Sequence, residues 1–260
     1  MILRRVIEHV KAQNWFAVGL DFLIVVVGVF VGLQVSNWNA AHADQERAYG
    51  YLERIRDDLD ADLDGYMNRV RFWSEVMAQG RLALDYAESD DAERQAEWTI
   101  LLAYFQASQV GEHTVTDATF EELKSAGELR LIGDPALRDQ LAYYYVNSNN
   151  PVMRQQPLYR EHVRAIIPID IQFHIWEDCY RSTAEGGQDL VDCPAPVESG
   201  RIRDIVERIS NDEALMGELT FWVSSLRVAI LIAENQIDGG LRLRDRVDSA
   251  LPPEARRVRK

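Results

Sequence analysis

A long apolar run near the N-terminus constrains this chain more than any other feature. Between Phe22 and Val35 the one strongly polar residue is Gln34, and apolar residues extend the run back to Trp15. The stretch from Trp15 to Trp38 covers the roughly 20 residues that a helix needs to cross a bilayer. A tryptophan stands at each end, where membrane interfaces favour aromatic side chains. The sequence therefore predicts a transmembrane helix over residues 15–38 rather than a buried helix of a soluble protein.

Basic residues are distributed unevenly about this run. Arg4, Arg5 and Lys11 precede it, and the first Lys or Arg after it is Arg47. Because Lys and Arg are enriched on the cytoplasmic side of transmembrane helices, we expect the N-terminus in the cytoplasm and the rest of the chain outside. A cleaved signal peptide is the alternative, since Ala41-His42-Ala43 has the small-x-small form of a cleavage site. The length of the run favours an uncleaved anchor.

Asp21 is the one acidic residue within the predicted span, and the sequence leaves its role open. In one interpretation the hydrocarbon begins at Phe22, Asp21 lies among the headgroups, and residues 1–14 form a cytoplasmic or interfacial amphipathic segment. In the other, Asp21 pairs with a basic or hydrogen-bonding group on another transmembrane helix. Gly28 and Gly32 form a GxxxG motif near the same helical face, which predicts close contact with a second helix. The residues predicted for the membrane interface and association are Asp21, Gly28, Gly32, Gln34, Asn37 and Trp38.

Charge and cysteine usage agree with an exported domain. The formal net charge is −14, and nearly all acidic residues follow the apolar run, so the domain repels nucleic acid and no nucleic-acid partner is expected. Cys179 and Cys193 are the only cysteines, and glycines lie between them. An even pair around a loop in an oxidising compartment predicts one disulfide. Two unrelated buried thiols are the alternative.

Helical periodicity dominates the remainder of the chain. Apolar residues from Leu52 to Met77 recur at steps of three and four, which predicts one long amphipathic helix that ends near Glu88. Further helices are predicted after an Asp90–Glu93 capping box, from Thr116 to Ala126, from Pro135, within Val152–Asp178, and from a Ser210–Glu213 capping box to Gly239-Gly240. No alternating strand pattern competes. The predicted fold is all-α: an extracytoplasmic helical bundle over residues 39–251, with a flexible basic tail at 252–260.

Two segments of the chain carry a recognisable pattern. The first reads "GLDFLIVVVGVFVGLQVSNWN" followed by "YLERIRDDLDADL", with an acid, an apolar run, an LQxxNWN exit and a charged helix. The second reads "TFEELKSAGELRLIGDPALRDQLAYYY", with a Phe-x-x-Leu-x-x-x-Gly turn and a Tyr-rich helix. Together they resemble an uncharacterised bacterial family of single-pass membrane proteins that is known only as a domain of unknown function. Asp21 stands where the family more often shows Glu, and residues 150–260 carry no likeness. The resemblance implies a bacterial inner-membrane anchor with an outside bundle, and it implies no activity.

Catalytic patterns are missing from the sequence. There is no GxSxG, no phosphate-binding glycine loop and no zinc-type cysteine spacing. His174 with Glu177 resembles half of a metal pair whose second half is absent, and a solvated pair is the simpler interpretation. The acids between Asp57 and Asp64 are expected on a solvated helix face. We therefore expect no enzyme, no catalytic residue, no cofactor and no metal site.

Two roles fit an anchored, non-catalytic bundle. The first is an interaction module that assembles with itself or with another membrane or envelope protein, in addition to the lipid bilayer. The second is a sensor-type bundle that binds a ligand and signals through a separate partner. About fourteen residues are expected inside, too few for an output domain, so the sequence favours the interaction module over the sensor.

Overall fold

The computed structural model describes residues 15–89, 96–111, 114–148, 150, 156–182 and 187–255. Helices make up most of the described chain, which confirms the predicted all-α class. The chain divides into two compact units, residues 1–51 and residues 52–260. The predicted segment 1–14, the Asp90–Glu93 capping box and residues 256–260 of the predicted tail lie outside the described residues.

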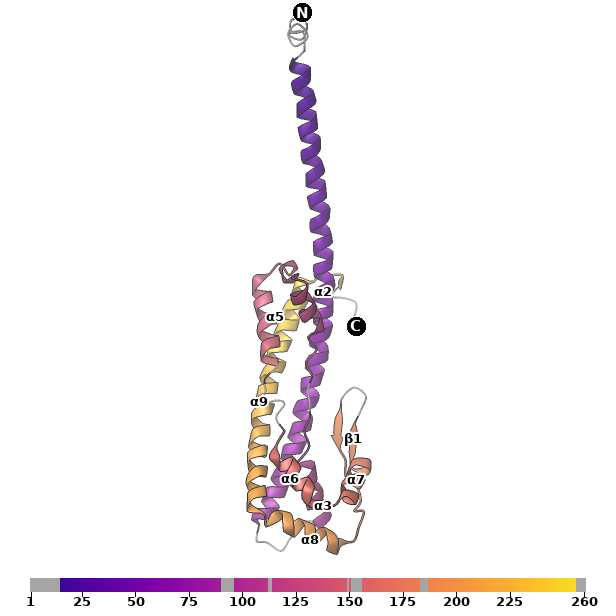
Figure 1. The fold of residues 1–260 in the computed structure, drawn as a ribbon, viewed down its shortest axis with the longest axis vertical. Coiled ribbons are helices and arrows are strands. Elements are labelled where there is room, and N and C mark those ends of the chain that lie inside the picture. The colour runs from indigo at the N-terminus through magenta and orange to yellow at the C-terminus, as the bar shows by residue number, and fades with distance from the viewer. Residues whose placement is uncertain are drawn as a thin grey trace, which may run out of the picture. The chain divides into compact units, whose positions relative to one another are not determined.

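The elements follow one another in the order shown by the colours of Figure 1. They are α2 (Trp15–Glu88), α3 (Glu97–Gln106), α4 (Ala118–Ser125), η1 (Leu129–Leu131), α5 (Pro135–Ser148), α6 (Leu158–Ile166), α7 (Ile169–Asp178), β1 (Tyr180–Ser182), β2 (Gln188–Leu190), α8 (Ser199–Ser210) and α9 (Glu213–Ala250). As predicted, α2 ends at Glu88.

In the second unit, α9 packs antiparallel against α2. Arg244 of α9 pairs with Asp60 of α2 at 2.6 Å, and a Cβ built on Gly80 would lie 2.5 Å from Val223 Cγ2. The glycine therefore lets the two backbones approach closely where their rows of side chains meet. Helix α5 lies beside α9, and α8 lies across the end of the bundle where α9 begins (Figure 1).

The core fills the space between these helices with aromatic and aliphatic side chains. Tyr66, Tyr104 and Tyr159 are fully buried. The Tyr159 hydroxyl donates a hydrogen bond to the Tyr104 carbonyl at 2.9 Å, and the Trp222 indole donates to the Ala107 carbonyl at 2.9 Å. Tyr159 and Trp222 thus find backbone acceptors for their polar groups inside the core.

Local capping chemistry sets several helix boundaries. The Asp134 carboxylate accepts a hydrogen bond from the Ala136 N–H at 2.9 Å, and Pro135 opens α5, as predicted. Helix α4 ends at Ser125. Two residues later Gly127, with φ 68°, adopts the left-handed backbone conformation that glycine reaches most readily. The predicted capping box at α9 is wrong in its first residue. Asp212, rather than Ser210, caps this helix by accepting from the Leu215 N–H at 3.0 Å.

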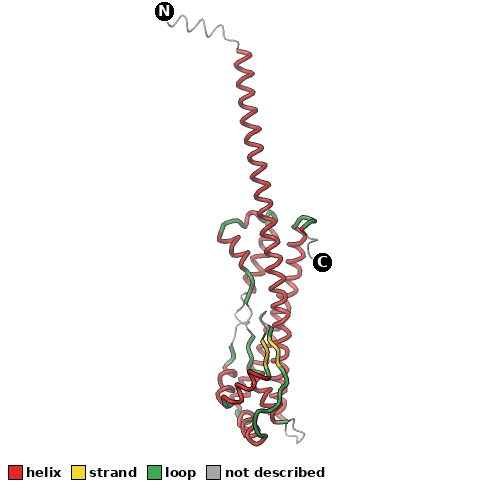
Figure 2. The backbone as a smooth tube through the Cα atoms, turned by 90° about the vertical axis from the view of Figure 1, so that its right-hand side faces the viewer, coloured by secondary structure: helices red, strands yellow, loops and turns green. Residues whose placement is uncertain are grey.

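Two other expectations differ from the structure. Strands β1 and β2 pair antiparallel, with Tyr180 opposite Leu190, and form the hairpin drawn in yellow in Figure 2. Three-residue strands are too short to show an alternating pattern. Helix α9 also continues through Gly239-Gly240 to Ala250 instead of ending there. A Cβ on Gly240 would lie 3.0 Å from Leu63 Cδ2, so close helix packing, rather than helix termination, accounts for this glycine.

Candidate functional site

The residues predicted for membrane association all lie on the first part of α2, in the first unit. Every large hydrophobic side chain from Leu20 to Trp38 is exposed. A Cβ on Gly28 or Gly32 would meet no atom within 4 Å. At about 100° of rotation per residue, Asp21, Gly28 and Gly32 fall within roughly 40° of one another on the helix, as predicted. Gln34 and Asn37 fall on the opposite face, so the six residues do not form a single surface.

Two helices of the described chain are long and apolar enough to cross a membrane. One is the described part of α2 from Gly19 onward, whose apolar window has no buried residue, and the other is α9, whose apolar window is 33% buried. The buried side chains of α9 include Leu219, Trp222 and Leu226, which belong to the core of the second unit. The apolar surface of α9 therefore has a partner within the fold, whereas that of residues 20–38 has none among the described residues.

The hairpin brings the two cysteines together. Cys179 immediately precedes β1, Cys193 follows β2, and their Cα atoms lie 5.2 Å apart with the sulfurs at disulfide distance. The carbonyl oxygens of both cysteines accept hydrogen bonds from α3: Gln106 Nε2 donates to Cys179 at 2.9 Å and Trp98 Nε1 donates to Cys193 at 2.7 Å. The hairpin is thus fastened to the core at the point where the predicted disulfide would close its loop.

His174 lies beside this pair, and its ring with the two sulfurs forms a group of the kind that holds zinc. Both ring nitrogens already have partners, however. Nε2 lies 2.8 Å from the Pro194 carbonyl oxygen, and Nδ1 lies 2.9 Å from Asp178 Oδ2. The sequence pattern pairs His174 with Glu177, but in the structure the acidic partner of His174 is Asp178. A metal here would need reduced sulfurs and a released histidine, so the arrangement suits a disulfide better.

The acidic run on α2 is not uniformly solvated, contrary to expectation. Asp62 is completely buried. Its Oδ1 accepts a hydrogen bond from the Thr116 N–H at 2.6 Å, and its Oδ2 lies 3.4 Å from the Tyr144 hydroxyl, which donates to it. Burial raises the pKa of Asp62 to about 6, although these hydrogen bonds act to lower it. Asp58, one turn earlier, accepts from the Thr119 N–H at 3.1 Å, so the two acids hold the segment before α4 and the first turn of α4 against α2.

Arg164 is a half-buried charge that the sequence did not indicate. Its guanidinium carbon lies 4.7 Å from the Phe105 ring centre and 5.1 Å from that of Trp176. It also donates to Ser108 Oγ at 2.9 Å and to Gln109 Oε1 at 3.2 Å. Burial lowers the pKa of Arg164 to about 9, which leaves it charged at neutral pH. These contacts connect α6 to the segment after α3, and they describe a structural role.

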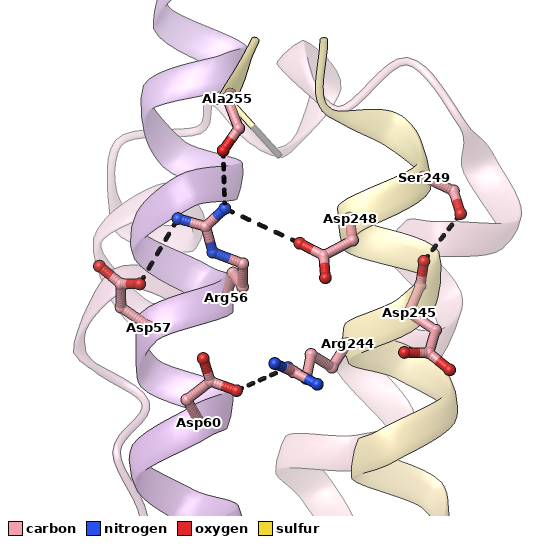
Figure 3. Close-up of polar contacts among 8 residues, drawn as sticks. All are labelled: Arg56, Asp57, Asp60, Arg244, Asp245, Asp248, Ser249 and Ala255. Carbon is pink, nitrogen blue, oxygen red and sulfur yellow. Dashed lines mark hydrogen bonds and ion pairs between the residues drawn. The ribbon is translucent and has the colours of Figure 1, made fainter. Parts of the chain in front are cut away.

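A row of polar contacts joins the middle of α2 to the C-terminal part of α9 (Figure 3). Asp60 Oδ1 pairs with Arg244 Nε at 2.6 Å, and one turn away Arg56 lies 3.6 Å from Asp57 and 3.8 Å from Asp248. Arg56 also donates to the Ala255 carbonyl at 3.3 Å. Arg56 thus connects α2, α9 and the residues after α9. Its side chain is only 18% exposed, so these contacts are partly shielded from water.

A pocket of about 750 Å³ lies between α5 and α9, and we call it the α5–α9 pocket. On α5 its lining includes Asp139, Gln140, Tyr143, Tyr144 and Asn147. On α9 it includes Gln236, Gly239, Arg242, Leu243 and Arg246. Tyr144 is buried, lines this pocket and also donates to Asp62, so the buried acid and the pocket share one side chain.

From the sequence, Tyr143-Tyr144-Tyr145 could line a ligand cavity, with core packing as the favoured interpretation, and no pocket between α5 and α9 was predicted. Tyr144 and Tyr145 are buried, as expected, but Tyr143 is 73% exposed. The polar residues that line the pocket on α9 recur at helical spacing among apolar ones, and their pattern resembles that of any exposed helix face. Only the antiparallel packing of α5 and α9 brings the two polar rows together. Comparisons with protein-family models, with curated proteins and with solved structures found no match to this chain.

Proposed function

We propose that this chain is a single-pass membrane protein in which residues 15–38 anchor a helical interaction module to the bacterial inner membrane. One observation carries the proposal: every large hydrophobic side chain from Leu20 to Trp38 is exposed, on a stretch of α2 that packs against no described residue. Contiguous apolar surface of this extent marks a membrane or protein contact rather than a solvated surface. The likeness to the single-pass family belongs to the same proposal and adds no reaction to it.

In this proposal the N-terminus is cytoplasmic and the second unit lies outside. Arg4, Arg5 and Lys11 support this orientation, because no Lys or Arg follows the apolar run before Arg47. A fusion of alkaline phosphatase to the C-terminus should be active, and a fluorescent cytoplasmic reporter at the same position should be dark. An inactive phosphatase with a fluorescent reporter would reject the topology. The intact mass of the purified chain separates anchor from signal peptide, since cleavage would leave a mature N-terminus at Asp44.

We further propose that the module associates through the face of the span that carries Asp21, Gly28 and Gly32. Small residues allow two helix backbones to approach closely, so Gly28→Leu and Gly32→Leu should weaken association without impairing insertion. Asp21→Asn and Asp21→Ala should release a partner that binds the carboxylate. An intramembrane hydrogen bond contributes about 0.6–2 kcal/mol, so this loss is expected to be partial.

The association experiment is crosslinking and co-purification of the full-length chain from membranes. Val27→Leu is the matched control, because Val27 lies about 120° away from Asp21 around the helix. The second unit alone provides the baseline for contacts outside the membrane. If all four substitutions associate like the parent chain, the membrane interface is removed from the proposal, and the surface of the bundle becomes the candidate for assembly.

A sensor-type bundle that signals through a separate partner is the second candidate function. The observation that favours it is the α5–α9 pocket, whose volume lies within the range of about 300–1,000 Å³ typical of small-molecule sites. An interaction module needs no such pocket. The two candidates are compatible with the same anchor, and ligand binding by the purified chain distinguishes them.

A further inference from the structure

The α5–α9 pocket contains a buried donor without an acceptor. Gln236 is only 9% exposed, and its Nε2 donates no hydrogen bond within the described part of the chain. Native structures leave few buried polar groups unpaired, and each of them calls for an explanation. Because Gln236 lines the pocket, a molecule that enters the pocket can supply the missing acceptor oxygen.

One end of the same pocket is cationic. Arg246 Nη2 is held by Asp134 Oδ2 at 2.7 Å, one turn beyond Arg242 on α9. Arg242 is exposed and forms no ion pair with any described residue. Its guanidinium therefore remains available to bind a carboxylate through two parallel hydrogen bonds. Asp139 is the acidic residue of the lining, and Asp134 neutralises Arg246, so Arg242 supplies the positive charge that the lining offers to a ligand.

The spacing between the two groups indicates the length of the ligand. Gln236 and Arg242 are six residues apart on α9, about 9 Å along the helix axis and about 120° around it, and both line the pocket. An extended peptide advances about 3.3–3.6 Å per residue, so two residues span about 7 Å and three span about 10 Å, which brackets the axial separation. The amide side chains of Gln140 and Asn147 line the opposite wall and offer both donors and acceptors, as a peptide backbone requires.

We propose that the α5–α9 pocket binds a short peptide through its free C-terminal carboxylate. Arg242 holds the carboxylate, Gln236 donates to a backbone carbonyl oxygen, and the rings of Tyr143 and Tyr144 contact the chain between them. All of these residues lie in the second unit, so the inference is independent of the membrane anchor.

The experiment is isothermal titration calorimetry on the full-length chain in a non-ionic detergent. The probes are N-acetyl-L-alanyl-L-alanine and its C-terminal amide, which differ in the carboxylate alone. We expect the acid to bind saturably and at least tenfold more tightly than the amide. Arg242→Gln should weaken binding of the acid by about tenfold and remove the preference for it. Gln236→Leu should weaken both probes by about fivefold, because a neutral hydrogen bond is lost in each case.

Arg227→Gln is the matched control, since Arg227 is exposed on α9 and lies outside the pocket lining. Thermal unfolding of each variant shows whether the fold is retained. Arg242 is exposed, and Gln236→Leu removes an unpaired buried amide, so both should unfold at or above the temperature of the parent chain. The proposal is overturned if the acid gives no saturable heat, if acid and amide bind equally, or if Arg242→Gln and Arg227→Gln have the same effect. None of these results bears on the anchor.

Discussion

Asp62 provides the sharpest test of the packing between α2, α5 and the segment before α4. Burial raises its pKa from the ordinary 3.8 to about 6. As pH rises, the unfolded chain therefore loses this proton before the folded chain does. The free energy of unfolding should fall between about pH 4 and pH 6 and level off above that range. At about 1.4 kcal/mol per pKa unit, the contribution of Asp62 falls by about 3 kcal/mol.

Asp62→Asn should remove this dependence while keeping the local contacts. The amide oxygen can accept from the Thr116 N–H, and the amide nitrogen can donate to the Tyr144 hydroxyl. The variant should thus match the parent chain near pH 4 and exceed its stability by up to about 3 kcal/mol at pH 8. Nearby Asp58 acts in the same direction as burial, since its negative charge also raises the pKa of Asp62.

The measurement is urea unfolding of the full-length chain in detergent, followed by tryptophan fluorescence from pH 4 to pH 8. Asp64→Asn is the control, because Asp64 is exposed on the same helix and should shift the curve by little at any pH. The difference between parent and variant isolates Asp62 from the other titrating groups. A constant offset between the two pH profiles, or a parent chain that is more stable than Asp62→Asn at pH 8, would refute the reasoning.

Three further predictions test other contacts. Gly239→Ala should raise the free energy of unfolding by up to about 1 kcal/mol through helix propensity. Gly240→Ala should lower it, because its Cβ would lie 3.0 Å from Leu63 Cδ2 and 3.2 Å from Tyr144 Cε2. Thermal unfolding of the two variants measures both effects. Cys179 and Cys193 should resist alkylation until reductant is added, and full labelling in native cells would contradict an oxidised pair. Replacing both cysteines with serine should lower the free energy of unfolding by about 3 kcal/mol. Arg244→Met should reduce stability by at most about 1 kcal/mol, since its ion pair with Asp60 is partly exposed, and high salt should diminish the difference.

Local signals in the sequence predicted much of the fold. The end of α2 at Glu88, the Asp134-Pro135 start of α5 and the stop at Gly127 each depend on chemistry within a few residues. Such features need no knowledge of the tertiary structure. The helical periodicity between Leu52 and Met77 likewise identified residues of α2 that lie in the core, among them Leu59 and Trp73.

The candidate site depended on contacts that no local pattern contains. Asp62 belongs to a run of acids that reads as a solvated face, and it is buried because Thr116 and Tyr144 approach from segments far along the chain. The same holds for the strands of the hairpin, which are stabilised by pairing and by the contacts of Cys179 and Cys193 with α3. The sequence indicates which residues are polar, but it does not indicate which of them will meet.

The sequence predicted that a helix ends at Gly239-Gly240, and this incorrect prediction falls beside the α5–α9 pocket for a physical reason. Two adjacent glycines inside a helix are unfavourable by about 1 kcal/mol each relative to alanine, so a local reading ends the helix there. In the structure the two residues serve different contacts. Gly240 lets Leu63 and Tyr144 pack against α9, whereas a Cβ on Gly239 would meet nothing within 4 Å, and Gly239 lines the α5–α9 pocket. Departures from local propensity tend to mark functional sites. The pair therefore supports the pocket, with its unpaired Gln236 one turn away, as the place where this bundle binds another molecule.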